Sequence, residues 1–406
     1  MQSPTTPSSH LSDASVVTVV DDLLRQAFAA GASDLHFENA QHAYRVRFRI
    51  DGLLKTAATL PAHLRDAVVA RIKVLARMDI AEKRLPQDGR FSHTHQGHPV
   101  DLRVSSLPTV LGEKLVLRVL NIQQSPPSLT DLGYEDDQLI HMHRALQSSD
   151  GMVLMTGPTG SGKTRSLYSC LHQLNRPDFN ISTLEDPVEI QLPGINQVQI
   201  HERVGLSFAH ALRALLRQDP DVIMLGEIRD LDTANIALQA AQTGHLVLST
   251  LHTPNAPSAL TRLQHMGVAP HLLSGSIRLV VAQRLLRRLC PLCKRALSDS
   301  AQSIALHEIA EADRRVLDRL CAPPAQFYEA AGCSQCDSGY TGRIGVFQVM
   351  PVSESVQDLL LTQAHTLTLA RQAASEHIPT LRQSAWRKAG QGLCDWRDVQ
   401  PNTPPD

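Results

Sequence analysis

The octapeptide from Gly157 to Thr164 limits the possible folds of this chain more than any other feature of its sequence. It fits the pattern G-x-x-x-x-G-K-[S/T], follows the apolar run Met152–Met155 and opens a stretch with helical spacing. Glycines let such a loop wrap closely around phosphates, so that backbone N–H groups and the helix N-terminus face negative charge. The sequence therefore predicts a P-loop whose nucleotide-binding residues are Gly157, Pro158, Thr159, Gly160, Ser161, Gly162, Lys163 and Thr164.

Two of these residues have specific roles in phosphoryl-transfer chemistry. A lysine at the position of Lys163 reaches the β- and γ-phosphates, and a hydroxyl at the position of Thr164 ligates Mg²⁺. The predicted ligands are therefore ATP and Mg²⁺. The alternative is a loop that matches the pattern by chance.

Short apolar runs recur around the predicted P-loop, each separated from the next by a helical stretch. Continuous runs of this length are typical of strands buried on both faces, as in a parallel sheet covered by helices. Polar or glycine-rich segments follow each run, and open α/β sheets bind ligands at such carboxyl ends. The runs are Met152–Met155, Ile181–Leu184, Val222–Leu225 and Leu246–Leu248.

Two of the runs deliver acidic residues at their ends. Glu227 follows Val222–Leu225 and Gly226, as in a Walker B element, and Glu185 opens an acidic cluster after Ile181–Leu184. Carboxylates are needed to organise Mg²⁺ and the attacking water, so both residues are predicted to be catalytic. The alternative is that each acid is an ordinary solvated turn residue.

The N-terminal part of the chain has a different pattern. Val16–Ala30 has the spacing of an amphipathic helix, and Tyr44–Ile50 alternates like a half-buried strand. Asp51-Gly52 predicts a hairpin turn into the next strand. Further elements are predicted at a helix over 64–75 and at strands over 100–105 and 114–120. This mixture without regular βαβ order predicts a small α+β domain.

Composition excludes some classes of protein and weakens others. The chain has 39 Lys+Arg against 40 Asp+Glu, and this balance gives no global field for nucleic acid or an anionic membrane surface. No stretch of about 18 apolar residues predicts a membrane span. The first 15 residues are rich in Ser, Thr and Pro and lack the features of a secretory signal, so we expect a disordered tail and a cytoplasmic protein.

Four of the seven cysteines form two C-x-x-C pairs, Cys290/Cys293 and Cys333/Cys336. Four thiolates can complete a tetrahedral Zn²⁺ site, and closed Cys₄ sites are structural. The sequence therefore predicts structural zinc, with buried reduced thiols as the alternative. The three other cysteines are expected to pack as small hydrophobic side chains: Cys170, Cys321 and Cys394.

Several longer motifs resemble those of the traffic ATPases of type II secretion and type IV pilus assembly. The resemblance covers roughly residues 18–350 and is carried by 31–36 (GASDLH), 84–90 (RLPQDGR), 185–189 (EDPVE), 215–230 and 243–253 (TGHLVLSTLHT). It implies a RecA-like P-loop core with a smaller N-terminal α+β domain and a Cys₄ zinc module. The segment 339–347 also looks like the zinc module of this family.

The resemblance implies roles for individual residues. Glu227 is the implied Walker B carboxylate, and Glu185 helps to polarise the attacking water. His245 and His252 sense the γ-phosphate or couple it to domain motion, unless they are hydrogen-bonded structural histidines. Arg90 and Arg103 match arginines proposed to reach the nucleotide from the N-terminal domain, unless they form structural salt bridges.

The family also implies an assembly and a location. It predicts a homohexamer, peripheral to the inner membrane, that acts on a polytopic inner-membrane platform protein without binding nucleic acid. The predicted organisation is a tail (1–15), an N-terminal domain (16–122), a linker (123–131), a core (132–287), a zinc module (288–348) and a helical region with a disordered tail (349–406).

The sequence departs from the family pattern at several points. Only about 15 residues precede the first predicted helix, Arg165 stands where a small residue is usual, and Gln348 stands where Glu is common. The cysteine pairs argue against the pilus-retraction branch. A nucleic-acid-translocating ring and a non-hydrolysing structural ring subunit remain the alternatives. The aromatic content of 4% disfavours the first, since such channels stack bases on aromatic side chains.

Overall fold

The computed structural model describes residues 15–40, 43–120, 126–309, 311, 314, 317 and 325–405. The chain divides into two compact units, residues 1–124 and 125–406, and this division falls within the predicted linker 123–131. The predicted tail before Ser15, linker residues 123–125 and Cys321 lie outside the described residues.

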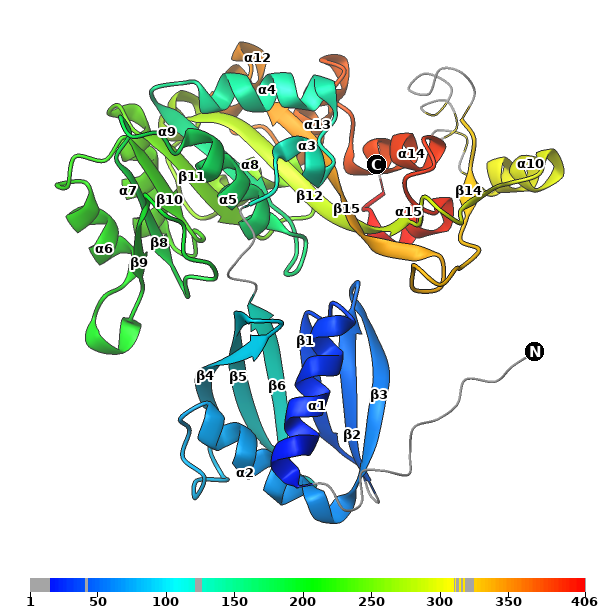
Figure 1. Cartoon of the computed structure of the whole chain (residues 1–406). Coiled ribbons are helices and arrows are strands. Elements are labelled where there is room, and N and C mark those ends of the chain that lie inside the picture. Colours follow the sequence, from blue (N-terminus) through cyan, green and yellow to red (C-terminus); the bar gives the residue numbers. More distant parts are fainter. Residues whose placement is uncertain are drawn as a thin grey trace. The chain divides into compact units, whose positions relative to one another are not determined.

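The N-terminal unit is an antiparallel six-stranded sheet with two helices (Figure 1). The strand order is β3-β2-β1-β6-β5-β4. Its strands are β1 Asp34–Asn39, β2 Ala43–Ile50, β3 Leu53–Pro61, β4 Gln87–His95, β5 His98–Thr109 and β6 Gly112–Leu120. Its helices are α1 Val16–Ala29, the 3₁₀ turn η1 Ala62–Leu64 and α2 Arg65–Leu75.

Local sequence explains most of this unit. Ser15 caps α1 through its side chain, and the apolar side of that helix, including Val20 and Leu24, is buried against the sheet. Asp51 and Gly52 have φ of 49° and 88°, as a two-residue hairpin turn requires. Strands β1 and β4 were not predicted. β4 buries none of its residues, so it has no apolar alternation to recognise.

The second unit is built around a seven-stranded sheet of order β15-β12-β7-β11-β10-β8-β9 (Figure 1). All neighbouring strands are parallel except β12 and β15. Its strands are β7 Gly151–Thr156, β8 Ile181–Glu185, β9 Asn196–Gln199, β10 Val222–Leu225, β11 Leu246–Leu251, β12 Ile277–Leu289 and β15 Tyr340–Pro351. The predicted apolar runs are the central strands β7, β8, β10 and β11.

Helices cover both faces of this sheet. Along β7, Met152 and Leu154 join one apolar core, whereas Val153 and Met155 join another, so the strand is buried on both sides. The helices are α3 Leu129–Leu132, α4 Asp136–Leu146, α5 Lys163–Leu174, α6 Phe208–Leu215, α7 Leu231–Gln242, α8 Ala256–His265, α9 Pro270–Ser276, α10 Asp299–Glu308, α12 Glu354–Leu361, α13 Thr366–Ser375, α14 Leu381–Gly390 and α15 Val399–Asn402. Two 3₁₀ turns accompany them, η2 Glu202–Val204 and η3 Trp396–Asp398.

The predicted bounds of the zinc module, 288 and 348, do not coincide with the ends of a structural element. Strands β12 and β15 pair in antiparallel register from Leu279–Pro351 to Leu289–Tyr340, and this pairing continues across the predicted limits at 288 and 348. In the segment between these strands, β13 Arg295–Ala296 and β14 Tyr328–Glu329 pair antiparallel as a separate two-stranded sheet.

The C-terminal residues differ from the disordered tail predicted within 349–406. Val399 is fully buried, and Thr403 is almost fully buried. Arg382 of α14 donates from Nη2 to the Thr403 carbonyl at 3.0 Å. The chain therefore packs back onto α14 as far as Thr403. The Val399 side chain is buried there, and the Thr403 carbonyl is hydrogen-bonded. In the described parts of the chain, no helix combines the length and apolar character needed to cross a bilayer.

Candidate functional site: the P-loop and the carboxyl edge of the core sheet

The predicted P-loop connects the end of β7 to the start of α5. Gly160 and Gly162 have φ of 81° and 91°, a region that favours glycine. A Cβ on Gly157 would lie 2.6 Å from both the Gln283 carbonyl oxygen and Ser161 Oγ. The loop is thus tightly curled around the N-terminus of α5. The Ser161 hydroxyl is buried there without a hydrogen-bond partner, as expected of a cradle that receives a polar ligand.

Lys163 folds back over this loop. Its Nζ donates to the carbonyls of Gly157 at 2.7 Å and Pro158 at 3.2 Å, and the residue is only 8% exposed. The pKa of Lys163 is lowered to about 8, chiefly by burial; the Glu227 charge opposes this shift and the Arg284 charge adds to it. Lys163 therefore lies within electrostatic reach of the predicted Walker B carboxylate.

Glu227 follows β10 and meets groups from two other segments. Arg229 Nε donates to Glu227 Oε1 at 2.7 Å, and His252 Nε2 lies 3.3 Å from Oε2. The loop that carries His252 is held to β7, because Thr253 N donates to Thr156 Oγ1 at 2.8 Å. A pocket of about 500 Å³ opens beside these groups, and its lining includes Glu227, His252, Ser258, Arg262 and His265.

Arg229 connects Glu227 to the acidic segment after β8. Besides Glu227, its guanidinium lies 3.4 Å from Asp186 and 3.9 Å from Glu202. The hydrogen bond to Glu227 and the neighbouring carboxylates raise the pKa of Arg229, so its charge is fixed. The strand-end acids are therefore linked through one arginine that the sequence motif itself supplies.

Glu185 ends β8 and is buried, with both carboxylate oxygens occupied. Tyr168 Oη donates to Oε2, and Oε1 accepts from Thr183 Oγ1 at 2.5 Å and from Gln197 Nε2 at 3.0 Å. Burial raises the pKa of Tyr168 above its usual range, so its phenol remains a donor. Because Tyr168 belongs to α5, Glu185 is anchored to the P-loop helix. Its oxygens are bonded to this helix and to strands β8 and β9.

The two predicted histidines lie at opposite ends of β11. His252 follows the strand and reaches Glu227, whereas His245 precedes the strand. The His245 carbonyl accepts from Gly151 N, and its Nδ1 lies 3.0 Å from the Ala240 carbonyl. Seven residue-to-residue steps at about 3.3 Å each separate the two positions by about 23 Å. The structure therefore brings His252, but not His245, to the P-loop edge within this chain.

Arg90 and Arg103 lie in the N-terminal unit, directly opposite each other on β4 and β5. Arg103 in turn lies opposite Arg118 of β6, and Arg118 opposite Asp34 of β1. The three arginines therefore form one row across the sheet, which we call the arginine row (Arg90, Arg103 and Arg118). Arg118 Nε donates to Asp34 at 2.9 Å, and Arg103 lies 3.8 Å from Asp88.

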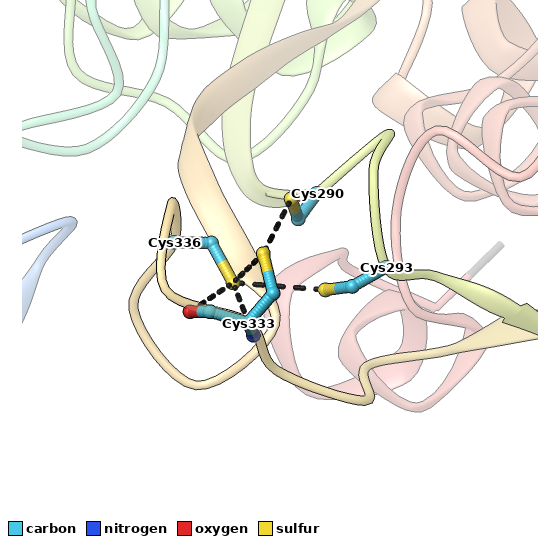
Figure 2. Close-up of side chains that lie close together, drawn as sticks. All are labelled: Cys290, Cys293, Cys333 and Cys336. Atoms are coloured by element: carbon cyan, nitrogen blue, oxygen red, sulfur yellow. Dashed lines mark hydrogen bonds between the residues drawn. The ribbon is translucent and has the colours of Figure 1, made fainter.

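The four paired cysteines, two after the end of β12 and two before the start of β15, converge in one cluster (Figure 2). All are free thiols, and their sulfurs lie within 4.8 Å of one another. The Sγ atoms of Cys333 and Cys336 are 3.5 Å apart, those of Cys293 and Cys336 3.6 Å, and those of Cys290 and Cys333 4.0 Å. Tetrahedral zinc with Zn–S bonds of about 2.3 Å holds its sulfurs about 3.8 Å apart, so the cluster fits this ion.

Some residues around the site were not recognisable from the sequence. Gln283 and Arg284 of β12 contact the P-loop region, yet they lie more than a hundred residues beyond it. Gln283 Oε1 accepts from Ser166 Oγ at 2.8 Å. Their place beside the P-loop follows from the pairing of β12 with β7, and the sequence alone does not give this sheet order. Tyr168 was hidden among the apolar positions of α5.

The remaining expectations concern single residues. Cys170 and Cys394 are fully buried, as predicted. Arg165 is exposed, so its large side chain extends into solvent without a steric clash. Gln348 is buried, and its Oε1 accepts from Ala256 N at 2.9 Å, where it holds the start of α8.

Comparisons with known proteins identify the family. Residues 9–401 match the family model described as "Type II/IV secretion system protein". The chain is 46% identical over 388 residues to the type IV pilus assembly ATPase PilB of Acinetobacter baylyi, covering 95% of this chain and 66% of that protein. It is 42% identical over 392 residues to the type II secretion system ATPase E of Vibrio cholerae, covering 95% of this chain and 75% of that protein.

A solved structure shares the fold. The ATPase DotB of Legionella pneumophila superposes with a TM-score of 0.70 at 20% identity, covering 98% of this chain and 97% of that one. The chain spans about two thirds of the length of the type IV pilus relatives that it matches.

Proposed function

The chain belongs to the Type II/IV secretion system family of ATPases, and we propose that it is a Mg²⁺-dependent ATP hydrolase driving a type II secretion or type IV pilus assembly machine. One observation carries the proposal. The P-loop lysine from β7–α5, the carboxylate after β10 and the histidine after β11 converge at one edge of a parallel sheet. A phosphate-binding lysine and a carboxylate beside it are groups that a phosphoryl-transfer site requires, and the histidine adds a side chain bonded to that carboxylate.

The residues of the P-loop would bind the phosphates. Backbone N–H groups of 157–164 and the N-terminus of α5 attract the negative charge, and Lys163 would exchange its carbonyl partners for phosphate oxygens. Thr164 would hold Mg²⁺, which when bound neutralises charge on the β- and γ-phosphates. The partnerless hydroxyl of Ser161 supports this use of the loop.

The strand-end residues would act on the reacting end of the nucleotide. Glu227 would organise the metal site. His252 is bonded to the same carboxylate, so a change at the metal site would move the loop that carries His252. Glu185 would help to polarise the attacking water once its bonds to Tyr168, Thr183 and Gln197 rearrange. His245 would take part only across a subunit boundary, because it lies at the opposite edge of the sheet.

The machine would convert hydrolysis into motion as a homohexamer. In this proposal the N-terminal unit swings relative to the RecA-like core, and Arg90 and Arg103 approach the nucleotide. The working protein would be cytoplasmic and would act on a polytopic inner-membrane platform protein to move pilin-like subunits. The similarity to relatives that are pilus assembly and secretion ATPases supports this role. The four-cysteine cluster would hold a structural zinc.

Phosphate release with Mg²⁺ and ATP tests the proposal. Lys163→Ala should abolish nucleotide binding and hydrolysis. Glu227→Gln should keep binding but lower hydrolysis at least about a hundredfold, because the carboxylate acts in the reaction. Hydrolysis at the wild-type rate by either variant means that the assigned site is wrong.

A further inference from the structure

Arg284 of β12 approaches the P-loop from the side of the sheet opposite to β11. A Cβ on Gly157 would lie 3.2 Å from Arg284 Nη1, so the guanidinium borders the first residue of the loop. Its charge lowers the pKa of Lys163. The two cations are therefore close enough to act on one ligand.

The partners of Arg284 leave its charge uncompensated. Nη1 donates to the Gln283 carbonyl at 2.8 Å and Nη2 to the Pro254 carbonyl at 2.7 Å. In the parts of the chain that the structure describes, no carboxylate pairs with this guanidinium, although it is half-buried. Burial of a cation without a counter-ion is costly, which indicates an anion that is supplied from outside the chain.

Three of the five N–H donors of the guanidinium remain for that anion. The nearest surface built for negative charge is the P-loop itself, which carries Lys163 and the N-terminus of α5. We propose that Arg284 is a second phosphate-binding residue, which contacts the phosphate chain of the nucleoside triphosphate together with Lys163. This inference rests on the proposed function and adds to it a residue that no sequence motif indicates.

The bond to Pro254 gives Arg284 a further role in the same site. Pro254 lies two residues after His252, the residue that reaches Glu227. A guanidinium that holds phosphate and the Pro254 carbonyl at once connects bound nucleotide to the loop carrying His252. Nucleotide binding should therefore order this loop through Arg284.

Arg284→Gln and Arg284→Lys test the proposal on the full-length protein, with Arg371→Gln as the matched control. Arg371 is exposed on α13 and belongs to the same unit. Affinity for a fluorescent ATP analogue with Mg²⁺ should fall at least about tenfold in Arg284→Gln, because a charged hydrogen bond is lost. It should fall less than about threefold in Arg284→Lys, which keeps the charge, and remain unchanged in the control.

The MgATP-induced rise in Tm, measured for each variant against its own free form, separates binding from stability. This rise should shrink in Arg284→Gln and persist in Arg284→Lys. If Arg284 served only to hold the two carbonyls of Gln283 and Pro254, Arg284→Gln would be less stable but would keep the wild-type rise in Tm. That result, or equal loss of affinity in both variants, overturns the inference.

Lys163→Ala separates this inference from the proposed function. If Lys163→Ala loses ATP binding while Arg284→Gln binds like the wild type, only the inference fails. If Lys163→Ala also binds like the wild type, the proposed function fails. Should Arg284→Gln not fold, Arg284→Lys decides alone, and affinity as weak as that of Lys163→Ala overturns the inference.

Discussion

The core sheet and the N-terminal sheet both gather charged residues, but they do so by different means. At the carboxyl edge of the core sheet, loops from separate strands bring Lys163, Glu227 and His252 together. On the N-terminal sheet, strand register aligns Arg90, Arg103 and Arg118 in one row. The first group is formed by short contiguous motifs, whereas the second exists only once three strands have paired.

The two regions also differ in charge compensation. In the core, both Arg229 and His252 bond Glu227, so this carboxylate is paired within the site. In the arginine row, like charges stand directly opposite each other, an arrangement that costs stability. Arg118 is bonded to Asp34, but no carboxylate among the described residues pairs with Arg90. The predicted catalytic carboxylate of the core is thus paired within the chain, whereas Arg90 in the arginine row is left open to an external anion.

The largest expected effect is the loss of ATP hydrolysis when arginines of the arginine row are replaced, which tests whether this row serves catalysis. The double variant Arg90→Gln/Arg103→Gln should hydrolyse ATP about a thousandfold more slowly, the scale of arginines that stabilise phosphoryl transfer. Its Tm should not fall, because removal of opposed like charges relieves repulsion. Phosphate release and thermal unfolding measure the two effects.

Arg45→Gln is the control for this experiment, since Arg45 lies on strand β2 of the same sheet, outside the arginine row, and pairs with Glu38 at 3.2 Å. It should retain hydrolysis. Wild-type hydrolysis by the double variant, or a fall in its Tm, would make the arginine row structural and remove the contrast between the two sheets.

The next effect concerns the stability of the core unit alone. Cys333→Ser removes one thiolate from the four-cysteine cluster, which should abolish stoichiometric zinc and lower the Tm of this unit by about 10 °C. Metal analysis and calorimetry measure both. The N-terminal unit, which has its own apolar core, should unfold as in the wild type.

Ser334→Ala is the matched control, because Ser334 is exposed between Cys333 and Cys336. It should keep zinc and Tm unchanged. If Cys333→Ser protein retains both, the cysteines are ordinary thiols and the zinc assignment is wrong.

The smallest effect is a pH dependence specific to the core site. Since the pKa of Lys163 is lowered to about 8, the free protein loses the lysine charge as pH rises through this value. Affinity for MgATP should therefore fall above pH 8, by up to about tenfold per pH unit. Binding titrations from pH 7 to 9.5 measure it.

The linked effect on stability has the opposite sign. Between pH 8 and the ordinary lysine pKa, the unfolded chain binds more protons than the folded one, so this residue's contribution to stability rises with pH. Lys163→Arg, which stays charged, should show neither dependence. A flat wild-type profile would contradict the buried position of Lys163.

Sequence predicted those parts of the molecule that short segments determine. The strand–loop–helix around 157–164, the central strands of the core and the Asp51-Gly52 turn each depend on adjacent residues, and the structure has them where they were predicted. Strand β4 escaped prediction because it buries no residue. The C-terminal segment was predicted to be disordered because it is rich in polar and proline residues, and the sequence does not show that Val399 is buried.

The composition of the site was less predictable than its fold. His245 and His252 belong to one motif, but a strand between them places them at opposite edges of the sheet. Arg284 lies far from the P-loop in sequence and reaches it only because β12 pairs with β7. Register and sheet order, which are tertiary properties, decide which side chains share a site.

A crystal structure of the protein with Mg²⁺ and a non-hydrolysable ATP analogue tests the central claim most directly. The account predicts the phosphates within 157–164, Lys163 Nζ on phosphate oxygens instead of the Gly157 carbonyl, and Thr164 Oγ1 about 2.1 Å from Mg²⁺. It also predicts that the Glu227 carboxylate faces the metal's water shell. Nucleotide bound elsewhere, or Glu227 remote from the metal, would contradict the assignment of this edge as the ATPase site.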